Sequence, residues 1–203
     1  MNKKDKLTYL LAEYKGTITA NLLKEKGIER EYLSQLKKEC KVERVGRGIY
    51  IDINIIEDSM FNIQYWFKKG IFSHGTALYL HQLTDRTLLK YTMTFPRKYN
   101  VTNVKLASVD TYSVIEDKYS IGINDKTTNS GNKVKVYSME RTLCDIVRKN
   151  SRVEKEMVIN AYKMYAKRKG KKLNKLYEYA RTFKVYDTVK KYIEVLLWLA
   201  LIN

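Results

Sequence analysis

Two histidines, with a serine and an aspartate nearby, are the first residues whose types and spacing suggest chemistry. His74 and His81 are about two helical turns apart, and Ser73 and Asp85 flank them. Such a set suggests a Ser/His/Asp nucleophile or part of a metal site. A nucleophile next to its base in sequence rarely has the required geometry, and two histidines alone leave a metal short of ligands. We therefore expect capping and packing rather than catalysis.

A second set of residues suggests a metal-dependent nuclease. Asp110 lies on an expected strand, and Glu116, Asp117 and Lys118 follow at the turn after it. Carboxylates of this kind hold Mg²⁺, and a lysine steadies the attacking water. The spacing is loose, however, and a charged turn between two exposed strands explains the same residues. We favour the turn and keep the nuclease as the alternative.

The segment from Ser138 to Asp145 is expected to be the capped start of a helix rather than a thiol active site. Ser138 is a suitable N-cap, and Glu140, Arg141 and Asp145 are expected to form ion pairs. Cys144 lies in the apolar pattern of this helix, where a thiol is usually inert. The sequence therefore predicts no catalytic residue, no metal and no cofactor, and we expect the protein not to be an enzyme.

The polar face of one short helix is the stronger functional candidate. Between Glu29 and Cys40, Leu33, Leu36 and Cys40 recur at helical spacing and are expected to form a buried stripe. At 100° per residue, the opposite face carries Glu31, Ser34, Gln35 and Lys38. Gln pairs with adenine, Glu accepts from cytosine and Lys contacts guanine, so these four are the expected base-contacting residues. An ordinary solvated face remains the alternative.

A glycine-tipped hairpin after this helix favours DNA binding. Residues 42–45 and 48–51 alternate as strands around Gly46 and Arg47, and an arginine at a tight turn reaches phosphate or the minor groove. Flanking residues on the same surface are expected to hold the DNA backbone. These phosphate or minor-groove residues are Thr19, Arg30, Lys37, Arg44 and Arg47.

These residues are positioned by a compact N-terminal module. Apolar spacing predicts a helix over residues 5–14 and another over 19–26, which Thr19 caps and Gly27 ends. With the helix over 29–40 and the hairpin, they predict a winged helix-turn-helix. An acidic connector follows, and we place the domain boundary after residue 56. The predicted domains are 1–56, binding DNA, and 57–203.

The remaining chain predicts a small antiparallel sheet packed by helices, so the fold class is α+β and mostly helical. A helix over 59–69 and another from Ser73 to about Leu83 precede the strands. The expected strands are residues 90–95, 109–115, 119–123 and 133–137, with a turn at 129–132. Four more helices are expected: 138–148, 152–169, 172–183 and 187–202.

The charge of the chain favours a polyanionic partner. The 203 residues carry a formal net charge of +17, and 44% are hydrophobic, which is enough for a buried core. Residues 151–203 are the most basic per residue, with 13 Lys and Arg against 5 Asp and Glu. We weigh a second nucleic-acid surface there, such as one for RNA, equally with a merely solvated face.

The sequence also indicates a compartment. No apolar run approaches the roughly 20 residues that a membrane span needs, and no secretory signal is visible at the N-terminus. With only two cysteines, neither a disulfide framework nor a zinc site is suggested. We expect a cytoplasmic protein with no membrane partner.

Six segments, in order from Ile18 to Arg148, resemble the AbiEi family of antitoxins. They read TITANLLKEKGI, REYLSQL, RVGRGIYI, KKGIFSHGTALYLHQLTDR, YTMTFPRKYN and VKVYSMERTLCDIVRK. The resemblance implies an N-terminal winged helix-turn-helix and a C-terminal antitoxin domain from a bacterial type IV toxin-antitoxin, abortive-infection (phage-resistance) system. It also implies autorepression at inverted repeats in the protein's own promoter. The cognate toxin is then a nucleotidyltransferase that forms no stable complex with the antitoxin.

The function expected from the sequence is that of an antitoxin and DNA-binding transcriptional autorepressor. Its expected partner is double-stranded DNA, on which a dimer is conceivable because the last helix is apolar enough to form an interface. The alternative is a metal-dependent nuclease or an RNA-binding protein that a winged helix targets to nucleic acid.

Overall fold

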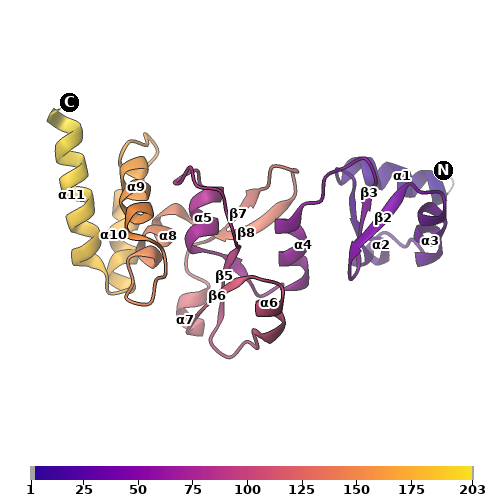
Figure 1. Cartoon of the computed structure of the whole chain (residues 1–203), viewed down its shortest axis with the longest axis horizontal. Coiled ribbons are helices and arrows are strands. Elements are labelled where there is room, and N and C mark those ends of the chain that lie inside the picture. The colour runs from indigo at the N-terminus through magenta and orange to yellow at the C-terminus, as the bar shows by residue number, and fades with distance from the viewer. Residues whose placement is uncertain (1–2, 203) are drawn as a thin grey trace. The chain divides into compact units, whose positions relative to one another are not determined.

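The computed structural model describes residues 3–202. They form an α+β fold of two compact units (Figure 1). The side chains of residues 3–5, 30 and 197–202 lie outside the described part. One unit contains residues 1–68 with 127–134, and the other contains 69–126 with 135–203. The division thus differs from a single boundary after residue 56, because the next helix and a hairpin tip group with the N-terminal module.

The N-terminal unit is built from four helices and a three-stranded antiparallel sheet in the order β1-β3-β2. Its elements are α1 (Lys3–Glu13), β1 (Thr17–Thr19), α2 (Ala20–Glu25), α3 (Arg30–Lys38), β2 (Val42–Gly46), β3 (Ile49–Asp52) and α4 (Ser59–Trp66). The predicted helices and hairpin are present. Strand β1 was not predicted, because three residues that end at the helix cap Thr19 are too few to show a period of two.

Caps and buried leucines explain why α2 and α3 form here. The backbone N–H of Leu22 donates to the Thr19 hydroxyl at 3.2 Å, so the predicted N-cap of α2 is confirmed. Gly27 has a φ of +65°, which lets the chain turn into α3. Leu33 and Leu36 are buried as predicted. Cys40, however, is exposed with a φ of +53°, so the predicted stripe was one residue too long because α3 ends at Lys38.

The core of the N-terminal unit joins α1, β1, α2, α3 and β2. Each of these elements contributes side chains that are less than one-tenth exposed. They are Leu7, Leu10, Leu11, Ile18, Leu23, Ile28, Leu33, Leu36 and Val42. Burial of this stripe orients α3, since the polar side of the helix must then face solvent.

The C-terminal unit combines a five-stranded sheet with seven helices among the described residues. Its elements are β4 (Ile71–Phe72), α5 (His74–Leu80), β5 (Thr92–Pro96), α6 (Thr102–Leu106), β6 (Asp110–Val114), α7 (Glu116–Tyr119), β7 (Ile123–Thr127), β8 (Lys133–Tyr137), α8 (Met139–Ile146), α9 (Lys155–Ala166), α10 (Leu173–Thr182) and α11 (Tyr186–Ile202). The tip joining β7 to β8 is the segment that groups with the other unit.

The sheet is mixed, which differs from the antiparallel sheet predicted from the sequence. Its order is β6-β5-β4-β8-β7. Strand β4 pairs antiparallel with β5, whereas β5–β6 and β4–β8 are parallel. Helix α6, which was not predicted, lies in the connection that returns the chain for the parallel β5–β6 pair. The two-residue strand β4 was missed because it is too short to show alternation.

One predicted strand is in fact a helix and a turn. Residues 119–123 were expected to be extended, but 116–119 form the short helix α7, and β7 begins at Ile123. Glu116 and Asp117 occupy the first turn of α7, where negative charge is favoured by the helix dipole. The lysine at its end, Lys118, donates from Nζ to the carbonyl of Thr182 at 2.9 Å. Acidic residues expected to mark a β-turn therefore start a helix.

The C-terminal helices pack into one hydrophobic layer, in which α8 lies against α9 and α10, and α9 and α10 against α11 (Figure 1). Their buried side chains include Leu143, Ile146, Tyr162, Tyr165 and Leu176. As predicted, Ser138 caps α8, accepting from the backbone N–H of Arg141 at 3.2 Å. Within the described chain, no helix is long and apolar enough to cross a membrane.

Candidate nucleic-acid interface

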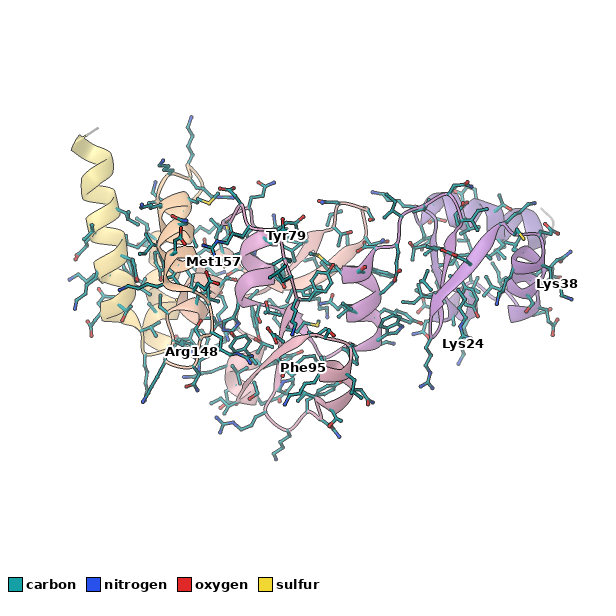
Figure 2. All side chains as sticks on the ribbon, in the orientation of Figure 1. Lys24, Lys38, Tyr79, Phe95, Arg148 and Met157 are labelled. Atoms are coloured by element: carbon teal, nitrogen blue, oxygen red, sulfur yellow. The ribbon has the colours of Figure 1, made fainter. Side chains whose placement is uncertain are left out.

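The outward face of α3 carries the four predicted base-contacting side chains together. Glu31, Ser34, Gln35 and Lys38 are all exposed, opposite the buried Leu33 and Leu36. Lys38 projects away from the body of its unit at the end of the helix (Figure 2). Glu31 occupies the first turn, and Lys37 and Lys38 the last, an order that complements the helix dipole. The face therefore offers both acceptors and donors to base edges.

The predicted backbone-holding residues fall into three groups. Lys37, Arg44 and Arg47 are exposed, whereas the side chain of Arg30 lies outside the described residues. Thr19 is only 9% exposed, and its hydroxyl already accepts from Leu22 as the cap of α2. Arg44 Nε donates to the carbonyl of Gly46 at 3.1 Å, so this arginine stays close to its own turn. A role for these residues at phosphate remains a prediction.

A tryptophan that the sequence did not single out braces the hairpin tip. Trp66, the last residue of α4, donates from Nε1 to the carbonyl of Arg47 at 3.2 Å. A Cβ at Gly46 would lie 2.1 Å from the Trp66 ring, so glycine is needed for this close approach. The hairpin turn is therefore held in place from the side of α4. The aromatic pattern of α4 was visible in the sequence, but its partner was not.

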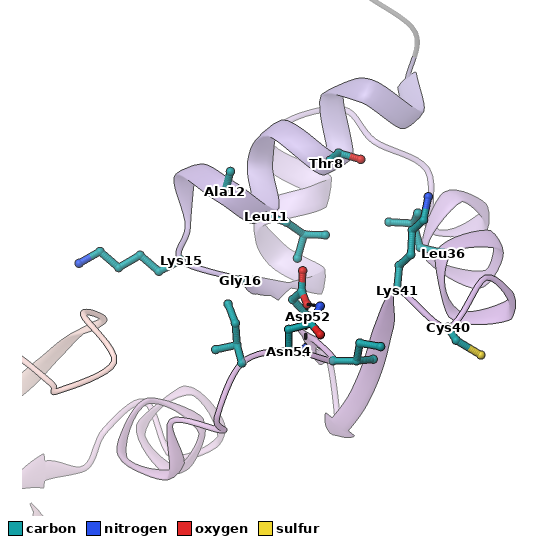
Figure 3. Close-up of a pocket in the computed structure, with 12 residues that line it drawn as sticks. Thr8, Leu11, Ala12, Lys15, Gly16, Leu36, Cys40, Lys41, Asp52 and Asn54 are labelled. Carbon is teal, nitrogen blue, oxygen red and sulfur yellow. Dashed lines mark hydrogen bonds between the residues drawn. The ribbon is translucent and has the colours of Figure 1, made fainter.

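A cavity of about 400 Å³ lies behind α3 (Figure 3). Leu11 of α1, Leu36 of α3 and the connector residues Ile53 and Ile55 form its apolar walls. At its edge, Asp52 accepts from the backbone and side-chain nitrogens of Asn54, each at 2.9 Å. Leu36 lines this space and, with Leu33, also packs α3 into the core that contains α1, so it helps to set the orientation of α3.

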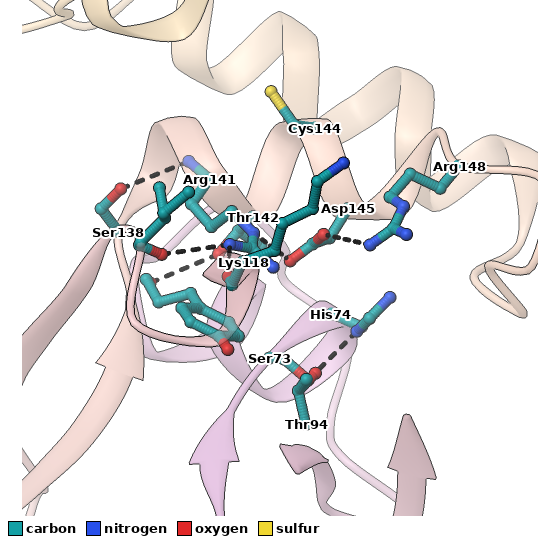
Figure 4. A network of polar contacts seen from close by, with 12 residues as sticks. Ser73, His74, Thr94, Lys118, Ser138, Arg141, Thr142, Cys144, Asp145 and Arg148 are labelled. Atoms are coloured by element: carbon teal, nitrogen blue, oxygen red, sulfur yellow. Dashed lines mark hydrogen bonds and ion pairs between the residues drawn. The ribbon is translucent and has the colours of Figure 1, made fainter. Parts of the chain in front are cut away.

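The C-terminal unit contains a buried ion pair where the sequence predicted one (Figure 4). Arg141 Nε donates to Asp145 at 2.8 Å, and both side chains are almost fully buried. Arg141 Nη1 also donates to the carbonyls of Lys118 and Ile121, at 2.8 and 3.1 Å. Its guanidinium lies 3.7 Å from the centroid of the Phe183 ring. These contacts fasten α8 to the loop before β7, which is a structural role.

The residues that suggested catalysis are not assembled into a catalytic set. Ser73 Oγ lies 3.1 Å from His74 Nδ1 and accepts from the Thr94 hydroxyl at 2.8 Å, whereas Asp85 is exposed to solvent. His81 Nε2 donates to the carbonyl of Tyr137 at 2.7 Å. Among the described residues, no group of three or more His, Cys, Asp or Glu side chains is placed to hold a metal.

The same holds for the thiol in α8. Cys144 is buried against the helical layer, and burial raises the pKa of its thiol. A thiol held neutral is a poor nucleophile, so the interpretation of Cys144 as a packing residue agrees with its surroundings.

His74 makes the stability of the C-terminal unit sensitive to acid. Burial, the largest effect, lowers the pKa of His74 from its ordinary 6.5 to about 4; Asp145 opposes this, and Arg148, Arg141 and Arg152 add to it. Its ring stacks on Tyr112 with centroids 3.5 Å apart. Because the unfolded chain binds the proton more readily, stability is complete above pH 6.5 and is lost as pH falls towards 4.

We expect the wild-type protein to lose about 2 kcal/mol of unfolding free energy through this group at pH 5 relative to neutral pH. The check is urea denaturation at both pH values for the wild type and for His74→Asn, a residue that tolerates the positive φ of this position. The variant should lose less unfolding free energy on acidification. The loss that remains is expected from His81, because burial also lowers the pKa of that histidine. An unchanged pH dependence would contradict the role of His74.

Comparison with known proteins shows which family the N-terminal segment resembles. The family model of the AbiEi antitoxin transcriptional regulators matches residues 5–51. The likeness to the AbiEi antitoxin regulators therefore covers residues 5–51. The resemblance predicted from the sequence is thereby confirmed over residues 5–51, the segment that contains α3 and its exposed face. No curated protein matches the chain.

A solved structure extends the likeness to most of the fold. The RV2827C protein from Mycobacterium tuberculosis is 12% identical, with a TM-score of 0.58, over 97% of this chain and 81% of that one. At such low identity the likeness shows the fold alone. It covers the AbiEi segment together with the sheet and the helices that follow it.

Proposed function

We propose that residues 3–52 form a winged helix-turn-helix with which the protein binds double-stranded DNA. In this proposal α3 lies in the major groove, and the β2–β3 hairpin is the wing that contacts the backbone or minor groove. The observation that carries it is the exposed face of Glu31, Ser34, Gln35 and Lys38 within the segment that matches the AbiEi regulators. The net charge of +17 supports a polyanionic partner.

The wider role that we propose is that of an antitoxin which represses its own operon. The DNA site is then a set of inverted repeats in its promoter, and the functional partner is a nucleotidyltransferase toxin held in no stable complex. The family of the N-terminal segment supports this role. The phage-defence setting, a dimer on DNA, RNA contact by the basic C-terminal helices and a cytoplasmic location belong to the same proposal.

The experiment that tests it is binding of the full chain to its own upstream region, followed by fluorescence anisotropy across a range of salt. Gln35→Ala is expected to cost about 1 to 3 kcal/mol at one base step, because one bidentate base contact is lost. Arg47→Ala is expected to weaken binding to all sequences alike and to flatten the salt dependence, because a phosphate contact is lost.

Lys98→Ala is the matched control, since Lys98 is an exposed cation of the C-terminal unit and is not one of the residues proposed to contact DNA. It should leave the preference for operator over scrambled DNA unchanged. The proposal fails if the wild type binds operator and scrambled DNA equally, or if Gln35→Ala and Lys98→Ala have the same effect on that preference.

A further inference from the structure

An elongated apolar groove lies between α9 and α11 in the C-terminal unit. It has a volume of about 610 Å³. Its floor is apolar, and Lys163 of α9 and Lys191 of α11 stand beside it. The lining residues are Ile159, Lys163, Thr188, Lys191, Tyr192, Val195 and Leu196. Along α11 these run from Thr188 to Leu196, nine residues and a length of about 12 Å, or about two helical turns.

A contact between two aromatic rings joins the two helices that form the groove. The rings of Tyr162 and Tyr192 stack with centroids 4.7 Å apart and planes inclined by 18°, which joins α9 to α11 at its base. Val195 nevertheless remains 57% exposed, and Ile159, Tyr192 and Leu196 are only half-buried. These four apolar side chains line one groove together, and a contiguous apolar surface of this kind favours a partner that covers it.

The charged side chains among the described lining residues of the groove are both lysines, Lys163 and Lys191. None of its lining residues is acidic. Two acids, Asp187 and Glu194, lie next to lining residues along α11. Glu194 pairs with Lys190 at 3.6 Å, and both charges act on Tyr177 of α10, on another side of α11. Lys163 and Lys191 are exposed, and neither has an ion pair within the described part of the chain. An occupant with negative charge beside apolar side chains is therefore complementary to the groove.

Charge also decides between a partner protein and a second copy of this chain. With a net charge of +17, two copies repel each other, and this groove would bring lysines against another basic surface. Nucleic acid would satisfy the lysines but would leave the apolar floor uncovered. An amphipathic helix with acidic flanks satisfies both, because side chains three and four positions apart fill such grooves.

We propose that the α9–α11 groove is a docking site for an acidic amphipathic helix of another protein. Leucine-type side chains of that helix cover Val195, Leu196 and Ile159, and its carboxylates lie against Lys163 and Lys191. The site belongs to the C-terminal unit and uses none of the residues assigned to DNA.

The test uses the full-length chain and a fluorescein-labelled synthetic peptide with a leucine stripe at helical spacing and glutamates on both sides of it. Anisotropy should show saturable binding, which a peptide of the same composition in scrambled order should not reproduce. Lys163→Glu/Lys191→Glu and Val195→Asp should each weaken binding by about tenfold or more. Circular dichroism establishes that each variant is folded.

Lys98→Glu/Lys105→Glu is the control, because it changes the net charge equally at two exposed lysines far along the chain from the groove. It should alter affinity by less than about twofold. Three results would overturn the proposal: equal weakening by the groove and control variants, equal binding of the scrambled peptide, or a self-association in sedimentation equilibrium that Val195→Asp abolishes. The last would identify a second copy as the occupant.

Discussion

Arg141→Met is expected to lower the free energy of unfolding by about 3 to 5 kcal/mol, the largest effect of any single substitution considered. Methionine keeps the length and apolar stem of arginine, so little volume is lost. It removes the cation that neutralises Asp145, which is 1% exposed, and leaves the carbonyls of Lys118 and Ile121 without this donor. A buried carboxylate without its main partner carries a desolvation penalty that the longer contact with Arg148 offsets only in part.

Chemical denaturation of the wild type, Arg141→Met and Arg148→Met measures this effect. Arg148 donates to the same carboxylate at 3.3 Å but is 35% exposed, so its loss should cost about 1 kcal/mol or less. Arg141→Met/Asp145→Leu should recover part of the stability, because no charge then remains buried without a partner. Equal costs for the two single variants would show that burial of the pair is not what matters.

Leu36→Ala is expected to cost about 2 to 5 kcal/mol and, with it, the ability to bind DNA. Leu36 is 1% exposed in the small core that joins α3 to α1, and its loss leaves a cavity that adjoins the one behind α3. Because α3 is short, it has little stability of its own without that contact. Denaturation followed by circular dichroism, with DNA binding measured on the same samples, gives both quantities.

The neighbouring residue supplies the control. Gln35→Ala removes an exposed side chain and should change stability by less than about 0.5 kcal/mol while altering sequence preference. Leu106→Ala, at a leucine that is 80% exposed, should likewise leave stability nearly unchanged. If Leu36→Ala were as stable as these two variants, α3 would be held by other contacts.

Local signals in the sequence predicted most of the helices. The cap at Thr19, the cap at Ser138 and the stripe of Leu33 and Leu36 each act within a turn or two of helix, so a few residues determine them. The polar face of α3 follows from the same periodicity. For this reason the exposure of Gln35 and its neighbours was predictable, whereas their contact with DNA remains a prediction.

Features that depend on distant partners were not predictable. Strand β4 has only two residues and exists because Phe72 pairs with Val136, which lies far away in sequence. The stacking of His74 on Tyr112 and the hydrogen bond from Trp66 to Arg47 also join separate elements. The prediction that Cys40 is buried was wrong for the opposite reason. Its apolar spacing continued the helical pattern one step past the point where the backbone leaves the helix.

The central position of β3 in the first sheet joins the two ends of the module that we propose binds DNA. Thr17, Ile18 and Thr19 pair with Ile51, Tyr50 and Ile49, so the strand before α2 is bonded to the strand after the wing turn. The two helices between them cannot separate from the wing unless that pairing opens. Hydrogen exchange of the buried amides in α2, α3 and β3 should therefore follow one common opening event, as in a single cooperative unit.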